Sequence, residues 1–168
     1  MRPKKVCHCD LIPSVDNKTE IVIAQHIRER GHPFNTARIV ADALVNSQIV
    51  VDYAENFCRH SNLIDEDTGI LFPSQNALDL CHVEKELLPK RLLLLDGTWN
   101  QAKRMYRKWP AIHSLRHYKI SPPNPGQYRI RLEPDDSSLS TIEATVMALK
   151  SLLLTNEQSG YCNFLEGL

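Results

Sequence analysis

The run of four leucines at Leu92–Leu95 constrains the fold more than any other feature of this chain. It lies between Arg91 and Asp96, and an apolar run this short is typical of a strand buried on both faces. A second such run, Glu-Ile-Val-Ile-Ala-Gln, occupies Glu20–Gln25. Strands buried on both faces belong to parallel sheets that helices cover, so these runs favour an α/β fold.

Helical patterns alternate with strand patterns along the rest of the chain. We expect strands at 20–25, 48–51, 69–74, 91–95, 117–121 and 128–132, and helices at 35–46, within 75–87, at 98–108 and at 140–154. The alternation predicts one α/β domain with a largely parallel sheet flanked by helices. The 168 residues suffice for one such domain, which we place at 20–168, after an irregular N-terminal segment at 1–19.

Positive charge is concentrated in one window of a formally neutral chain. Twenty basic residues balance twenty acidic ones, but no acidic residue lies between Asp96 and Glu133. The window holds eight basic residues: Lys103, Arg104, Arg107, Lys108, Arg116, Lys119, Arg129 and Arg131. Two interpretations stay open, a solvated helix face or a surface that binds a polyanion such as RNA.

The five cysteines are odd in number and irregularly spaced, which does not indicate a disulfide framework. Cys7 and Cys9 could supply half of a zinc site, or could be free thiols. The N-terminus lacks the apolar run of a signal peptide, and no apolar run is long enough for a membrane span. We therefore expect a cytoplasmic protein without membrane contact.

Three segments are predicted at the carboxyl ends of strands, where parallel sheets bind ligands. They are Phe72-Pro73-Ser74, Asp96-Gly97-Thr98-Trp99 and the loop before Ser140. Asp96 is a candidate catalytic carboxylate, Gly97 allows a ligand to approach closely, and Trp99 offers a flat face to a base. The alternatives are that Asp96 only helps to cap the next helix and that Trp99 belongs to the core.

Two further motifs have both a structural and a functional interpretation. Ser140-Thr141-x-Glu143 is a capping box, and the same helix start could bind a carboxylate or a ribose hydroxyl. In Tyr128-Arg129-Ile130-Arg131, the two arginines share one face of a strand. They could bind phosphates or a carboxylate, or protect an exposed edge strand with charge.

His26-x-x-Glu29 and Asn35-Thr36-x-Arg38 follow the first predicted strand. They could contact a ligand or form a hydrogen-bonded loop, and their spacing is not that of a zinc protease. The chain has no Gly-x-Gly-x-x-Gly, no phosphate-binding P-loop and no Gly-x-Ser-x-Gly. These absences argue against dinucleotide-dependent redox enzymes, kinases and α/β hydrolases.

Together these segments resemble the DTW-domain family. The resemblance runs in order through Cys7-His8-Cys9, His26-Ile-Arg-Glu29, Asn35-Thr36-Ala37-Arg38, Leu95-Asp96-Gly97-Thr98-Trp99-Asn100-Gln101-Ala102-Lys103, Tyr128-Arg129-Ile130-Arg131 and Leu139-Ser140-Thr141-Ile142-Glu143-Ala144. It implies a SPOUT-related fold with a trefoil knot near the C-terminal helix. It also implies a tRNA-uridine aminocarboxypropyltransferase, which moves the 3-amino-3-carboxypropyl group of S-adenosylmethionine to N3 of a tRNA uridine and releases methylthioadenosine.

The resemblance also suggests roles for single residues. Asp96 would take the N3 proton as a general base. Cofactor contacts would come from Leu71, Phe72, Pro73, Ser74, Gly97, Thr98, Trp99, Tyr128, Arg129, Leu139, Ser140, Thr141 and Glu143. Contacts to tRNA would come from His26, Glu29, Asn35, Thr36, Arg38, Lys103, Arg104, Arg107, Lys108 and Arg131, and we expect a monomer.

The family pattern has a Cys-x-x-Cys upstream of its Cys-x-Cys, for which this sequence has no counterpart before Cys7. We therefore interpret 1–19 as a possible remnant of a zinc-binding module and assign no metal ligand, with Cys7 and Cys9 as the candidates. Two rival functions fit the same motifs: a SPOUT-type RNA methyltransferase and a non-catalytic RNA-binding domain. A third rival, a metal-binding interaction module, would depend on the two cysteines alone.

Overall fold

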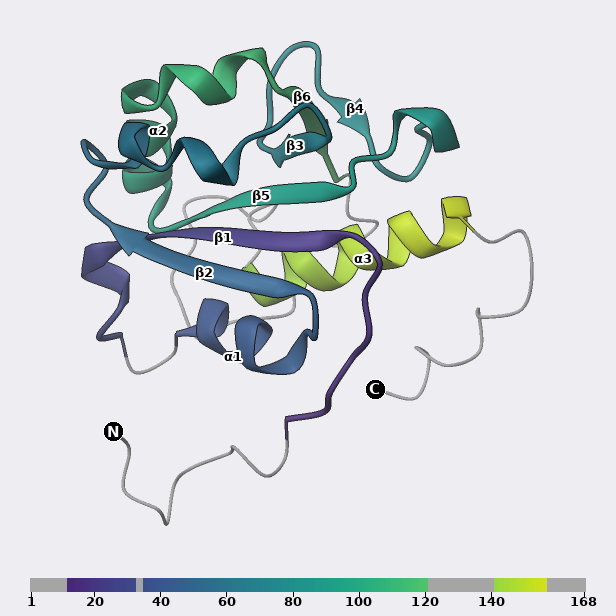
Figure 1. The fold of residues 1–168 in the computed structure, drawn as a ribbon, viewed down its shortest axis with the longest axis horizontal. Coiled ribbons are helices and arrows are strands. Elements are labelled where there is room, and N and C mark those ends of the chain that lie inside the picture. Colours follow the sequence, from purple (N-terminus) through teal and green to yellow (C-terminus); the bar gives the residue numbers. More distant parts are fainter. Residues whose placement is uncertain (1–11, 33–34, 121–140, 157–168) are drawn as a thin grey trace.

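Six parallel strands form the centre of the computed structural model, which describes residues 12–32, 35–120 and 141–156 (Figure 1). Their order across the sheet is β2-β1-β5-β3-β6-β4. The strands are β1 Glu20–His26, β2 Ser47–Asp52, β3 Thr68–Leu71, β4 Leu78–Asp79, β5 Arg91–Asp96 and β6 Arg116–Lys119. The longer helices are α1 Thr36–Ala43, α2 Trp99–Lys108 and α3 Thr141–Asn156. The predicted α/β class and the parallel sheet are therefore confirmed.

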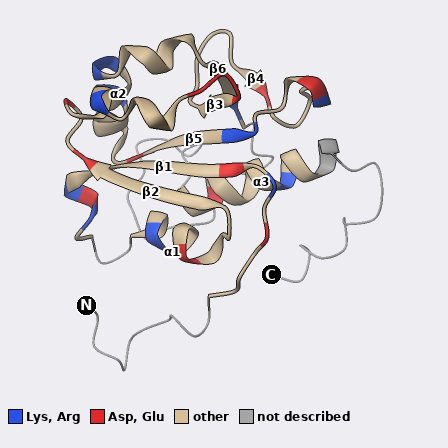
Figure 2. Ribbon diagram, viewed as in Figure 1, with Lys and Arg blue, Asp and Glu red and all other residues tan. Residues whose placement is uncertain are grey.

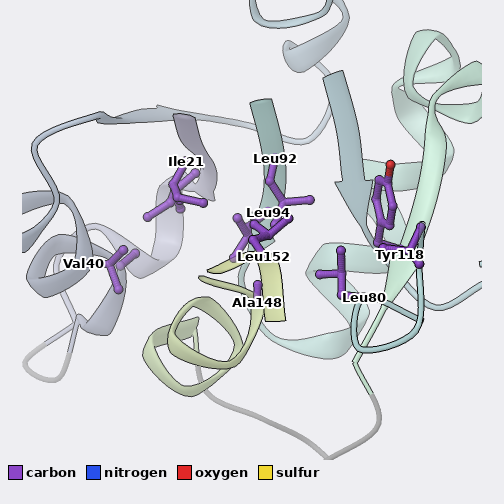
Figure 3. Close-up of a cluster of buried hydrophobic side chains, with 11 residues drawn as sticks. Ile21, Val40, Leu80, Leu92, Leu94, Tyr118, Ala148 and Leu152 are labelled. Carbon is purple, nitrogen blue, oxygen red and sulfur yellow. The ribbon is translucent and has the colours of Figure 1, made fainter. Parts of the chain in front are cut away.

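Side chains alternate along β1 and β5 between two hydrophobic cores. Ile21 and Leu92 lie in the core that also contains Val40 of α1 and Ala148 and Leu152 of α3 (Figure 3). The intervening residues of both strands lie in a second core with Met105 of α2 and with Trp109. Helices α1 and α3 thus cover one face of the sheet and α2 covers the other (Figure 1).

Helices α1 and α2 begin one residue after the predicted starts at 35 and 98, and each has a side-chain cap at that preceding residue. The Asn35 side chain accepts from the backbone N–H of Arg38, and Thr98 forms a capping box with Gln101. Helix α1 ends at Ala43 instead of continuing to Asn46 as predicted. It stops early because Leu44 adopts an extended backbone and forms a bridge with Val15.

The prediction of a helix within 75–87 is wrong. That stretch contains the short strand β4 and a 3-10 turn at Lys85–Leu87. β4 pairs with β6, and the Asp79 carboxylate accepts from the backbone N–H of Cys81, which turns the chain directly after the strand. Pairing with a distant strand has overridden the local pattern.

The other predictions are confirmed with shifted ends, or lie outside the described residues. The strands predicted at 69–74 and 117–121 are observed as β3 and β6. The region 54–68 contains the 3-10 turns Phe57–Arg59 and Ser61–Leu63, and a further one, Pro110–Ser114, follows α2. The predicted strand at 128–132 and the cap at Ser140 are not among the described residues. Within the described ranges, no helix combines the length and the apolar character needed to cross a bilayer.

Candidate active site at the carboxyl edge of the sheet

Asp96 is the last residue of β5, and its side chain is only 6% exposed. Gln25 lies opposite it in the β1–β5 register, and its Nε2 donates to Asp96 Oδ2 at 2.8 Å. The hydroxyl of Thr141, in the first turn of α3, donates to Asp96 Oδ1. Both carboxylate oxygens are therefore held by neutral donors, which leave further lone pairs free to accept a proton.

Gln25 is itself fixed by a two-way contact with Asn35. Gln25 Nε2 donates to Asn35 Oδ1 at 2.9 Å, and Asn35 Nδ2 donates to Gln25 Oε1 at 3.3 Å. The same Asn35 oxygen accepts from the backbone N–H of Arg38 at 3.1 Å. The start of α1 is thereby connected to the catalytic candidate Asp96 through one buried amide.

Gln25 was not among the site residues predicted from the sequence, although one signal was present. It is the polar residue that ends an apolar run, and Asp96 ends the neighbouring run in the same way. Only the register between β1 and β5 makes the two side chains meet.

The missing side chain of Gly97 leaves room for the side chains of Gln101 and His26. A Cβ at this position would lie 2.9 Å from Oε1 of Gln101 and 3.4 Å from Cβ of His26. The Gln101 oxygen accepts from the backbone N–H of Thr98 at 2.6 Å, so the glycine makes room for the capping box of α2.

His26 ends β1 and packs beside Gly97. Its side chain is buried, and its Nδ1 accepts from the backbone N–H of Arg28 at 3.4 Å. An Nδ1 that accepts a hydrogen bond leaves the ring proton on Nε2. Burial and then the nearby Arg28 guanidinium lower the pKa of His26 below its ordinary value of 6.5, so the ring is neutral at pH 7.

Aromatic rings join the end of β3 to the start of α2. The Trp99 ring is 43% exposed, which is not the exposure of a core residue, and it stacks on Phe72 with ring centroids 5.9 Å apart. Phe72 in turn stacks on Tyr106 at 4.3 Å. The Lys103 ammonium lies 4.9 Å from the centroid of the Trp99 ring. Two of the predicted ligand-binding segments therefore meet at Trp99 and Phe72.

The basic residues of α2, blue in Figure 2, are all exposed. Helix α2 packs on one face of the sheet, and Asp96 contacts Thr141 of α3 on the other face. Arg104 forms a salt bridge with Glu55, and its Nε donates to Glu55 Oε1 at 2.8 Å. Within the described part of the chain, no salt bridge involves Lys103, Arg107 or Lys108. Of these cations, Lys103 is in the first half of α2, nearest to the carboxyl edge.

The other predicted contacts divide into three groups. Glu29 and Thr36 are buried near the end of β1 and the start of α1, whereas Arg38 is exposed and pairs with Asp42. Of the predicted cofactor contacts, Leu71, Ser74 and Glu143 are partly buried, whereas Pro73 and Thr98 are exposed. Outside the described residues lie Cys7, Cys9, Tyr128, Arg129, Arg131, Leu139 and Ser140. In the part that is described, no cluster of three His, Cys, Asp or Glu side chains could hold a metal ion.

Comparison with known proteins identifies the family. Proteins named tRNA-uridine aminocarboxypropyltransferase 2 match from Drosophila melanogaster, with 34% identity over 160 residues that cover 90% of this chain, and from Mus musculus, with 28% identity over 165 residues that cover 92%. An Arabidopsis thaliana protein named tRNA-uridine aminocarboxypropyltransferase A is 28% identical over 129 residues, or 63% of this chain. The chain spans between 48% and 64% of the length of these curated relatives. No solved structure matches. The DTW domain matches residues 1–166, and the chain therefore belongs to the DTW-domain family.

Proposed function

We propose that this chain modifies tRNA by transferring the 3-amino-3-carboxypropyl group of S-adenosylmethionine to N3 of a uridine. The observation that carries the proposal is the state of Asp96, a buried carboxylate that ends a central strand. Only neutral groups of the described chain donate to it, and no described lysine or arginine forms a salt bridge with it. A carboxylate held in this way can accept a proton. The names of the relatives support the proposed reaction.

The reaction needs a base because N3 of uracil is a weak acid. A bond forms between N3 and the γ-carbon of the transferred group, the bond from that carbon to sulfur breaks, methylthioadenosine leaves, and the N3 proton passes to Asp96. Gln25 and Thr141 occupy two of the roughly four lone-pair sites of the carboxylate, so others remain for this proton. General base catalysis of this kind contributes about two to four orders of magnitude to the rate.

The groups around Asp96 suit a cationic donor. S-adenosylmethionine supplies a carbon that is already activated by its sulfonium. Gln25 and Thr141 carry no charge, and the neutral His26 ring adds none at pH 7. A sulfonium near Asp96 therefore meets no repulsion from these three side chains. The exposed Trp99 ring, stacked on Phe72, offers a flat surface to the donor.

The donor would be held by the segments that converge on this edge. We assign contacts to the ends of β3 and β5 and to the first turn of α3, through Leu71, Phe72, Pro73, Ser74, Gly97, Thr98, Trp99, Thr141 and Glu143. The donor's carboxylate would be held by Arg129 or by the helix start at Ser140. Arg129 and Ser140 lie outside the described residues, so their assignment depends on the sequence motifs alone.

The tRNA would contact the carboxyl edge and α2 together. Lys103, Arg107 and Lys108 are available for phosphates, and Lys103 is beside Trp99 at the edge itself. Because α2 covers the opposite face from Asp96, the RNA must extend over the end of the sheet. The target uridine must leave its stack to reach a carboxylate that is 6% exposed.

The finer assignments belong to the same proposal: a SPOUT-like fold with a C-terminal trefoil knot, a catalytic domain at 20–168 and a cytoplasmic monomer. The parallel sheet supports the SPOUT assignment. So does the contact between the first turn of α3 and the end of β5.

The test is incubation with bulk tRNA and S-adenosylmethionine labelled in its aminocarboxypropyl arm, followed by mass spectrometry of the nucleosides. Label in 3-(3-amino-3-carboxypropyl)uridine supports the proposal. A methylated nucleoside without arm label would identify a methyltransferase instead. If S-adenosylmethionine produces no thermal shift and tRNA still binds, the chain is a non-catalytic RNA-binding domain.

A further inference from the structure

We propose that Gln25 is a positioning residue for Asp96, and that Asn35 locks Gln25 into this role. The inference rests on the proposed function, because it concerns the orientation of the base that accepts the N3 proton. Gln25 is 1% exposed, and its amide contacts both the carboxylate and Asn35. Neither Gln25 nor its pairing with Asn35 belongs to the motifs that suggested the function.

The hydrogen bonds settle which end of each amide carries the nitrogen. The backbone N–H of Arg38 can only donate, so the atom of Asn35 that it reaches must be Oδ1. The other atom of Asn35 is then Nδ2, which also donates to the backbone carbonyl of Glu29 at 3.3 Å. Its donation to Gln25 identifies the accepting atom as Oε1, and Gln25 must therefore present N–H to Asp96.

A flipped Gln25 would place its carbonyl oxygen against the carboxylate, and the two acceptors would repel each other. Asn35 excludes that state, because its own orientation is fixed by the start of α1. Asp96 therefore always meets a donor on Oδ2. Together with the Thr141 hydroxyl on Oδ1, this contact fixes the plane of the carboxylate and hence the direction of the lone pairs that remain for the substrate.

A positioning role and a merely structural role differ in a measurable way. If the carboxylate that Gln25 contacts is not the working base, Gln25→Glu lowers stability without a specific change in the pH dependence of transfer. If it is, Gln25→Glu places a second carboxyl group in direct contact with that base. Two carboxyl groups in contact share a proton, so the base becomes available only at higher pH.

The chain offers a matched control at the opposite edge of the same sheet. Gln48 Nε2 donates to Glu20 Oε1 at 2.6 Å, near the amino ends of β1 and β2. Gln48→Glu therefore creates a carboxyl pair away from Asp96, at a glutamate whose other oxygen accepts from Arg91 Nε at 2.7 Å. Each variant should lose stability as pH rises, because two carboxylates then ionise in contact, and the loss should be smaller for Gln48→Glu because the Arg91 charge offsets part of the repulsion. Only Gln25→Glu should change the pH dependence of transfer.

The experiment measures single-turnover transfer of the labelled arm to bulk tRNA between pH 5 and pH 9 for the wild type, Gln25→Glu and Gln48→Glu. We expect the Gln25→Glu profile to move to higher pH by about one unit or more, and the Gln48→Glu profile to coincide with that of the wild type. Coincidence of all three profiles would overturn the proposal, and so would equal displacement by both variants.

Asn35→Ser decides the matter if Gln25→Glu does not fold. Serine retains the cap of α1 but lacks the amide that locks Gln25. We expect kcat to fall about tenfold while KM for S-adenosylmethionine changes less than twofold, which is the effect of a misoriented base. An unchanged kcat would overturn the inference. Failure of the wild type to label tRNA is a different result, since it would remove the proposed function itself.

Discussion

The ammonium group of Lys103 lies over the exposed ring of Trp99, 4.9 Å from its centroid. The pair places a cation beside a flat surface at the carboxyl edge of the sheet. Nucleic acids offer the complementary groups, a phosphate and a base, to such a surface. Phe72, which directly follows β3, stacks on the same Trp99 ring, so this surface joins residues from β3 and from α2.

Replacement of Lys103 and Arg107 by alanine should weaken tRNA binding and reduce its salt dependence. Both side chains are exposed, and they lie four residues apart on α2, so they share one helix face. The slope of log Kd against log salt concentration should decrease by about one for each phosphate that the variant no longer neutralises. Binding titrations at several salt concentrations measure this slope.

A matched control is the double variant Lys85→Ala with Lys90→Ala. It also removes two positive charges, from the segment that precedes β5. Lys90 there pairs with Asp67 at 2.9 Å, at the edge of the sheet away from Asp96. This control should retain the wild-type slope. An equal decrease in both double variants would show that α2 contributes only general positive charge.

Asp96→Asn should abolish transfer while preserving the fold. The asparagine oxygen can accept from Gln25, and its amide nitrogen can donate to the Thr141 hydroxyl, which can also act as an acceptor. The hydrogen bonds to Gln25 and Thr141 are thus retained, but the neutral amide cannot accept the N3 proton. The single-turnover rate should fall by about 10² to 10⁴.

Asp96→Asn should still bind S-adenosylmethionine. In a thermal-shift titration, the ligand concentration that gives half of the maximal shift should be the same for Asp96→Asn as for the wild type. Asp67→Asn, which replaces an exposed carboxylate far from the site, should leave transfer unchanged. An unaltered rate in Asp96→Asn would remove this residue as the base.

The central strands could be predicted because their patterns are local. β1 and β5 are apolar on both faces, which is visible in consecutive residues. The error at 75–87 has an equally local origin. Ala77, Leu80 and Val83 recur every three residues and are all buried, as in a helix. They reach the core from turns instead, because Leu78–Asp79 pairs with β6, and no local pattern reports that distant partner.

The candidate site could likewise be predicted only where its residues belong to local motifs. Asp96 and Thr141 were selected from separate motifs, and the structure brings them into contact. Gln25 was missed because its role depends on a register between strands 71 residues apart, which no spacing within a motif encodes. The pairing of Arg104 with Glu55 was missed for the same reason, since it joins a helix to a distant loop.

Gly69→Ala should destabilise the domain strongly. A Cβ at Gly69 would enter the ring of Tyr118, with Cδ2 at 2.9 Å, and would lie 3.1 Å from Cβ of Pro89. Tyr118 is fully buried, so its ring has no free space to move into. Overpacking of this kind costs about 1–3 kcal/mol. Urea unfolding measures the loss, and Gly31→Ala, where a Cβ meets nothing within 4 Å, should change the free energy of unfolding by no more than about 0.5 kcal/mol.

His26 should make the domain less stable in mild acid. Burial and the Arg28 charge lower the pKa of His26 in the folded state below 6.5, so the unfolded chain binds more protons at this residue. Stability must then fall as pH drops below about 6.5, because protonation favours the unfolded chain. His26→Gln removes the titrating group and should show a smaller decrease in the free energy of unfolding between pH 7.5 and pH 5.5. An equal decrease in the wild type and in His26→Gln would mean that the imidazole is not kept neutral at the carboxyl edge of the sheet, where Asp96 lies.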